Sequence, residues 1–247
     1  MRYHTGIGAV ILALAVSHAA HGEGMGDDWA YHGATGPAHW ATLNSGFGLC
    51  STGTQQSPID IGAAFNTHLD PPVPDWSAKG WQVEHAGTGL VAFNEDGGHI
   101  TLDDHNYTLI QINFHTPSEH ALDGQFFPME AQFMHRDADG HFLILSVMIR
   151  GGGRNDALNA ILAALPDAPG QAKPLAKIDL ASLITDLSDS YRYQGSLTMP
   201  PCAETVSWIV LADPLVVGDE ALLALESAFP ENRRPIQPLN RRIVLTD

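Results

Sequence analysis

The chain has 247 residues, and its 12 lysines and arginines stand against 28 aspartates and glutamates, which gives a formal net charge of −16. This balance argues against a nucleic-acid partner, because duplex binding needs clustered cations, and against an anionic membrane surface. With 44% hydrophobic and 16% charged residues, the composition is globular, and the chain is long enough to bury one large core.

The first 19 residues predict a secretory signal peptide. Arg2 precedes a ten-residue apolar run at 7–16, which is too short to span a bilayer, and Ser17-His18-Ala19 places small residues where signal peptidase reads the chain. A buried N-terminal helix is the alternative. No later stretch is apolar over 18 residues, so we expect a periplasmic or secreted domain at 20–247 with no membrane insertion after cleavage.

The two cysteines, Cys50 and Cys202, are 152 positions apart (202 − 50) and form no CxxC motif. An even pair in an exported chain predicts a disulfide. Two unpaired buried thiols are the alternative.

Short apolar runs separated by turn residues dominate the chain after residue 58. We predict irregular structure at 20–57, and hairpin turns at 96–98 and 137–140. Helical spacing follows Asp156 and Asp219, which we expect to cap two helices that end before Pro166 and Pro230. The reading is one mostly β domain with peripheral helices (α+β), and its clearest strands are expected at 80–83, 90–93, 99–102, 107–115, 129–134 and 142–149.

Motifs in a fixed order extend over nearly all of the mature chain. They are Trp29-Ala30-Tyr31, Gly36-Pro37-Ala38-His39-Trp40, Gln56-Ser57-Pro58-Ile59-Asp60-Ile61, His115-Thr116-Pro117-Ser118-Glu119-His120, Phe127-Pro128-Met129-Glu130-Ala131, Tyr193-Gln194-Gly195-Ser196-Leu197-Thr198, Pro200-Pro201-Cys202 and Arg234-Pro235-Ile236-Gln237-Pro238-Leu239-Asn240. Together they resemble the α-class carbonic anhydrases and their bacterial exported branch in particular, whose members place a disulfide where the cysteine pair falls.

The resemblance implies a single domain around a large, mainly antiparallel, twisted sheet of about ten strands. It also implies a chemistry, the reversible hydration of CO2 to bicarbonate by a zinc-bound hydroxide. In that family three histidines hold the zinc, and the pKa of the bound water falls to about 7.

The expected zinc ligands are incomplete in this chain. The family places its first two ligands as His-x-His on one strand, where alternate residues share a face. Here His115 matches the second ligand, but Asn113 stands at the first and Gln132 at the third. Neutral amides are poor zinc ligands, so we expect no zinc at high occupancy.

Other family positions are partly kept. Thr88 stands where the family has its proton-shuttle histidine, and threonine cannot relay protons near neutral pH. Thr198 and Glu119 match the pair that orients the zinc hydroxide, while Gln111 and Glu130 match residues that hydrogen-bond to ligand imidazoles. The apolar wall for CO2 is matched by Met134, Ile144, Leu197 and Trp208.

Two interpretations follow from this mixture. In the first, the polar groups form a buried hydrogen-bond network, the protein is inactive or strongly impaired in CO2 hydration, and it binds or scaffolds an unknown protein or small molecule. In the second, a weakly held zinc still supports CO2 hydration. The sequence favours the first, because Asn113 and Gln132 replace two of three ligands.

Overall fold

The computed structural model describes residues 29–247. The expected signal peptide at 1–19 and the first residues of the expected mature domain lie outside the described residues. Within the described part, no helix is both long enough and apolar enough to cross a membrane.

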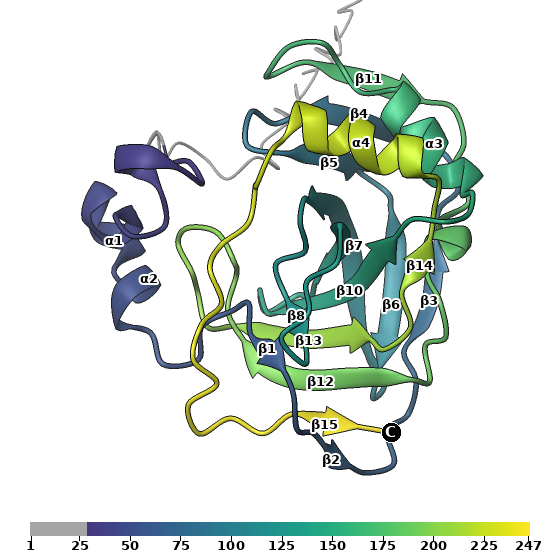
Figure 1. The fold of residues 1–247 in the computed structure, drawn as a ribbon. Coiled ribbons are helices and arrows are strands. Elements are labelled where there is room, and N and C mark those ends of the chain that lie inside the picture. Colours follow the sequence, from purple (N-terminus) through teal and green to yellow (C-terminus); the bar gives the residue numbers. More distant parts are fainter. Residues whose placement is uncertain (1–28) are drawn as a thin grey trace, which may run out of the picture.

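A large mixed sheet organises the chain, and its strands appear as arrows in Figure 1. Thirteen of the strands form this sheet, and β1 and β8 form a separate pair. The strands are β1 (Asp60–Ile61), β2 (Phe65–Asn66), β3 (Val73–Trp76), β4 (Trp81–His85), β5 (Leu90–Phe93), β6 (Gly98–Leu102), β7 (His105–His115), β8 (Ala121–Leu122), β9 (Met129–Arg136), β10 (Phe142–Arg150), β11 (Ala172–Leu175), β12 (Ser190–Gly195), β13 (Val206–Leu211), β14 (Leu215–Val216) and β15 (Leu245–Thr246).

The main path through the sheet runs β11-β4-β5-β7-β9-β10-β13-β12-β15-β2, with β3, β6 and β14 attached at its sides. Most pairs are antiparallel, whereas β10 pairs in parallel with β13 and β14, and β15 with β2. The expected class, mostly β around a large and mainly antiparallel sheet, is confirmed. The sheet has more strands than the expected ten because several short peripheral strands join it.

The central strands β7, β9 and β10 have apolar side chains on both faces. On β9, Phe133 belongs to the larger core cluster and Met134 to a second cluster, because successive residues of a strand point to opposite faces. The larger cluster also holds Leu158 and Leu225 from the two longer helices. Figure 1 shows α4 (Asp219–Ala228) lying across β4 and β5, with α3 (Asp156–Ala163) beside one end of it. The two longer helices therefore cover one face of the sheet. The opposite face, here called the second face, carries Met134 and its cluster and is left for the site.

Both longer helices are found where the sequence predicts them, but their caps differ from the prediction. The N-cap of α3 is Asn155, whose side chain accepts a hydrogen bond from the backbone of Leu158, and Asp156 is the first helical residue. Gly218 is the N-cap of α4. Asp219 instead accepts from the backbone N–H of Gly152, so its carboxylate holds the loop between β10 and α3.

The region expected to be irregular contains two short helices, α1 (Trp40–Leu43) and α2 (Leu49–Thr52), and two 3-10 turns at Gly33–Thr35 and Ser45–Phe47. A third 3-10 turn spans Leu180–Leu183. Four-residue helices show no periodicity in a sequence, and here tertiary contacts stabilise them. The buried indole of Trp40 donates to the carbonyl of Ala30.

The predicted disulfide is confirmed. Cys50 in α2 is bonded to Cys202, with the two Cα atoms 5.1 Å apart, and no described cysteine is free. Cys202 is fully buried in a small cluster with Tyr31 and Trp40.

Candidate metal centre

The three residues that the resemblance places at zinc-ligand positions, Asn113, His115 and Gln132, come together on the second face of the sheet. Asn113 on β7 lies directly opposite Gln132 on β9, and His115 lies opposite Glu130. Residues that face each other across an antiparallel pair point to the same side. All four side chains are almost fully buried, so each polar atom needs a partner inside the protein.

His115 keeps the geometry of a ligand. Its Nδ1 lies 2.7 Å from the backbone carbonyl oxygen of Asn232. Since a carbonyl only accepts, Nδ1 carries the proton and Nε2 presents a lone pair. Nε2 makes no hydrogen bond and lies 3.6 Å from Oε2 of Glu119.

The two amides turn hydrogen-bond donors toward the site. Asn113 Oδ1 accepts from Gln111 Nε2 at 2.7 Å, so Asn113 presents its buried Nδ2 group, which has no partner among the described residues. Gln132 donates from Nε2 to Glu119 Oε2 and to Glu130 Oε1, at 2.9 Å each. An amide nitrogen with two protons is then fully used and has no lone pair for a metal.

Glu119 is held by groups other than the expected Thr198. Its Oε1 accepts from the backbone N–H of Arg234, and its Oε2 accepts from Gln132. Between the described residues no hydrogen bond joins Glu119 to Thr198, although Thr198 is itself buried. The side chains of the expected hydroxide-orienting pair are therefore not coupled in this structure.

Glu130 is the best-satisfied acceptor of the site. It accepts backbone N–H bonds from Glu119 and His120, and side-chain bonds from His120, Gln132 and Ser146. Burial alone would raise the pKa of Glu130, but the charge of His120 and the hydrogen bonds from that residue lower it to about 2. The carboxylate therefore stays ionised.

The sequence reasoning missed several members of this network. His120 Nε2 lies 2.6 Å from the hydroxyl of Tyr193, which also bonds to Ser57. Tyr193 and Ser57 lie within the motifs that carried the resemblance, so those motifs could have indicated them. Asn232 lies outside every motif, and no signal in the sequence could have singled it out.

The residues expected to form the apolar wall belong to one cluster on this face. Met134, Ile144 and Trp208 are buried together, and Leu197 packs against them. The structure thus brings the apolar positions and the polar positions to the same side of the sheet.

Thr88 lies in the turn between β4 and β5, where it is half-buried. His85, at the end of β4, is half-buried rather than a free surface residue, because its ring packs edge-on against Phe229 with centroids 4.6 Å apart. His99 lies on β6 opposite Thr108. Within residues 29–247, none of these three side chains contacts His115, whose neighbours are Asn232, Glu119 and Tyr31.

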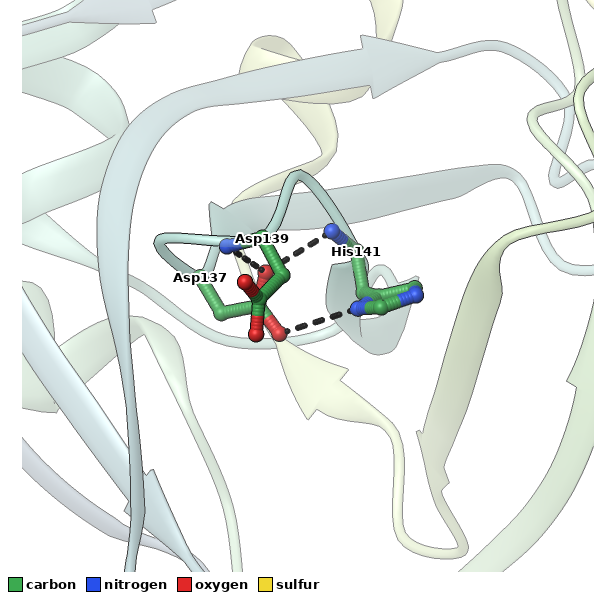
Figure 2. A group of neighbouring side chains, drawn as sticks. All are labelled: Asp137, Asp139 and His141. Atoms are coloured by element: carbon green, nitrogen blue, oxygen red, sulfur yellow. Dashed lines mark hydrogen bonds and ion pairs between the residues drawn. The ribbon is translucent and has the colours of Figure 1, made fainter.

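A different set of potential ligand atoms gathers in the β9–β10 hairpin, where Asp137, Asp139 and His141 lie within 4.8 Å of one another. Figure 2 shows that their contacts organise the turn. Asp137 accepts from the backbone of Asp139 and of His141, and its other oxygen lies 3.2 Å from His141 Nδ1. Asp139 and His141 are exposed, and these contacts account for the cluster as a turn.

The residues present at the aligned positions do not fit zinc. Zinc in proteins is held by imidazole, thiolate or carboxylate lone pairs. Of the three positions here, His115 offers a lone pair, Asn113 presents an N–H group whose positive end would face the cation, and the amide nitrogen of Gln132 is committed to Glu119 and Glu130. No catalytic step through a metal follows from this set of side chains.

The comparisons with known proteins agree on one family. A family model described as eukaryotic-type carbonic anhydrase matches residues 35–247. A carbonic anhydrase of Pectobacterium carotovorum is 36% identical over 219 residues, which are 88% of this chain and 90% of that protein. A carbonic anhydrase of Neisseria gonorrhoeae is 36% identical over 239 residues, covering 96% of this chain and 95% of the relative.

Solved structures give the same answer. The α-carbonic anhydrase of Thermovibrio ammonificans, in complex with the inhibitor sulfanilamide, superimposes with a TM-score of 0.86 at 37% identity, covering 89% of this chain and 99% of that one. Dioscorin in complex with ascorbate superimposes with a TM-score of 0.83 at 28% identity, covering 89% and 98% of the two chains. With the sheet, the motifs and these matches in agreement, the chain belongs to the α-carbonic anhydrase family.

Proposed function

We propose that this protein is an exported member of the family that holds no zinc at the family's metal position, does not hydrate CO2, and serves as a binding or scaffold protein. The observation that carries the proposal is the direction of the two amides. Asn113 presents an N–H group where zinc requires a lone pair, and Gln132 uses both Nε2 protons to bridge Glu119 and Glu130. These hydrogen bonds link the two amides to Gln111 and to the two carboxylates.

The partner would be a small molecule or a protein in the periplasm or outside the cell. Export is supported by the signal-peptide pattern at 1–19 and is consistent with the disulfide, since such bonds persist in oxidising compartments. A small-molecule partner has support from dioscorin, a relative of the same fold whose structure is described as a complex with ascorbate. The net charge of −16 does not suit nucleic acid.

The alternative is a zinc enzyme with a weakly held metal, acting on CO2 and bicarbonate. One observation favours it: the apolar cluster of Met134, Ile144 and Trp208 is assembled beside the polar site, as a CO2 pocket would require. The ligand positions do not favour it.

Zinc content and CO2 hydration, measured on one purified sample, separate the two functions. We expect far less than one zinc per chain by elemental analysis and no hydration above the buffer rate, because His115 is the only imidazole among the three expected ligand positions. The protein would be equilibrated with zinc before the analysis, so that loss during purification cannot explain a low value. Near-stoichiometric zinc with fast hydration would overturn the proposal.

A further inference from the structure

Two buried polar atoms at the site lack a hydrogen-bond partner. Among the described residues four buried side-chain nitrogen or oxygen atoms are in this position: Asn113 Nδ2, His115 Nε2, Ser190 Oγ and Arg192 Nε. The first two belong to residues at i and i+2 of β7, so they share a face of the strand. Asn113 and His115 are 4% and 2% exposed, which leaves bulk water unable to serve them.

The chemistry of the two atoms is opposite. Asn113 Nδ2 is a donor, because Asn113 Oδ1 is already the acceptor for Gln111. His115 Nε2 is an acceptor, because Nδ1 donates to the carbonyl of Asn232. A single group that serves both atoms must accept from one and donate to the other.

Charged ligands fail this requirement. A metal cation would bond to His115 Nε2 but would face the N–H group of Asn113. An anion would accept from Asn113 but would lie beside the lone pair of His115 Nε2 and the buried Glu119, whose Oε2 is 3.6 Å from that nitrogen. A neutral oxygen that carries a proton satisfies both atoms.

We propose that Asn113, His115 and Glu119 form a binding site for one neutral, proton-bearing oxygen, a buried water molecule, at the position where the family holds zinc. The water accepts from Asn113 Nδ2 and donates to His115 Nε2 and to Glu119 Oε2. The two acceptors are 3.6 Å apart, a separation that one water can bridge, and Glu119 Oε2 has a second lone pair beyond the one used by Gln132. Three hydrogen bonds are typical of a buried water.

This inference rests on the proposed absence of zinc, and it joins the unpartnered atoms of the site to its hydrogen-bond network. It also explains why Asn113 can be tolerated on a buried strand face: the water accepts from its Nδ2 group, which no described side chain reaches.

The test is a high-resolution crystal structure of the mature protein in two forms, one treated with a chelator and one soaked with zinc, with anomalous data collected at the zinc edge. We expect in both forms an oxygen peak without anomalous signal, at hydrogen-bond distance from Asn113 Nδ2, His115 Nε2 and Glu119 Oε2. Zinc density on His115 would overturn both this inference and the proposed function. Density that showed neither zinc nor an oxygen peak at this position would overturn this inference and leave the proposed function standing.

Two variants sharpen the test. Asn113→Leu removes the donor with little change in side-chain size, and we expect the oxygen peak to be lost or to leave its position. Ser146→Ala is the matched control, because Ser146 bonds to Glu130 and makes no contact with the water site, so the peak should remain. Should Asn113→Leu fail to fold, nitrogen NMR of the wild-type protein decides: His115 Nε2 should carry no proton and should show the shift of a hydrogen-bonded acceptor. A protonated Nε2 would overturn the inference.

Discussion

At position 132 a glutamine amide donates both of its protons to carboxylates, with Glu119 and Glu130 each 2.9 Å away. A histidine there would offer a ring nitrogen to a metal and a ring N–H to a carboxylate. The substitution therefore preserves the donor that Glu130 requires and removes the lone pair that zinc requires. Asn113 accepts from Gln111 through its Oδ1 and turns its Nδ2 group, which has no lone pair to offer a metal, toward the site.

This reasoning predicts that the zinc site can be restored. Replacing both residues, Asn113→His and Gln132→His, should place three imidazoles on adjacent strands, since Asn113 and Gln132 are directly opposed and His115 is two residues along the same face. Gln111 and Glu130 remain to accept from the new rings. We expect the double variant to bind about one zinc per chain and to gain measurable CO2 hydration.

The two single variants are the matched controls for this prediction. Each supplies only two imidazoles, so each should bind zinc weakly and gain little activity. Zinc titration followed by a hydration assay of all four proteins is the measurement. A double variant that folds but does not hold zinc would show that the surroundings of the site have also diverged, for instance through the missing bond between Thr198 and Glu119.

The positions of the site could be predicted from the sequence, but its connections could not. Alternation along the strand at 107–115 places Asn113 and His115 on one face, and the structure has them there. The hydrogen bond from Gln132 to Glu119 depends on side-chain orientations. The orientation of His115 depends on Asn232, in a loop more than a hundred residues away. Neither is encoded in local periodicity.

At the scale of the element, β9 separates two environments. Gln132 and Met134 point to the site, whereas Phe133 and His135 lie against the ring of Trp76 on the opposite face. His135 is fully buried and accepts a hydrogen bond at Nε2 from the Trp76 indole, while its Nδ1 lies 2.9 Å from the carbonyl of Phe133. The ring therefore links β9 to β3 in its neutral form.

His135 predicts a loss of stability in mild acid. Burial lowers its pKa from 6.5 to about 4, partly offset by its hydrogen bonds to the carbonyls of Leu143 and Phe133. Between these two values the unfolded chain binds a proton that the folded protein does not, so the free energy of unfolding falls as pH drops from about 6.5 to about 4. The full effect is on the order of 3 kcal/mol at 1.36 kcal/mol per unit.

Urea unfolding at several pH values between 4 and 7.5 measures this effect. The variant His135→Gln keeps an acceptor for Trp76 but does not titrate, so its stability should depend less on pH than that of the wild type. His105→Gln, at an exposed position on β7, is the control and should leave the dependence unchanged. Equal pH dependence in the wild type and in His135→Gln would contradict the prediction.

The sequence predicts the bounds of an element where its apolar pattern is long, and does not predict them where the pattern is short. The apolar runs at 107–115 and 142–149 mark the strands β7 and β10 to within a few residues. The helices α1 and α2 were not predicted, because four residues span barely one turn and show no periodic apolar face. The cap of α3 was placed one residue late because Asn155 and Asp156 are both capable N-caps, and only the fold selects between them.

At the scale of the whole molecule, the disulfide fastens the N-terminal helices to the site. The carbonyl of Cys50 accepts from the Arg234 guanidinium, and the carbonyl of Cys202 accepts from Gln56, whose own side-chain oxygen accepts from Arg234. The backbone of Arg234 in turn donates to Glu119. A continuous path of bonds thus leads from the disulfide to a carboxylate of the site.

The global architecture was accessible from the sequence because it is spread over many motifs in a fixed order. Fold class does not depend on any single side chain, and with two cysteines in the chain one intramolecular pairing is possible. The number of strands was underestimated, since two-residue strands such as β2, β14 and β15 exist only through pairing with distant neighbours and have no pattern of their own.

Reduction of the disulfide should lower the melting temperature without unfolding the protein at room temperature. The bond joins residues 152 positions apart, and closing a loop of that length stabilises the folded state by about 5 kcal/mol at most in the chain-entropy model, and by about 2–4 kcal/mol in typical proteins. For a domain of this size that corresponds to a fall of roughly 5–15 °C. Calorimetry with and without a reductant measures it, and the double variant Cys50→Ser with Cys202→Ser should melt at the lower temperature in both conditions. Identical melting of the oxidised and reduced protein would mean that the hydrogen bonds through Arg234 and Gln56 alone hold the N-terminal helices in place.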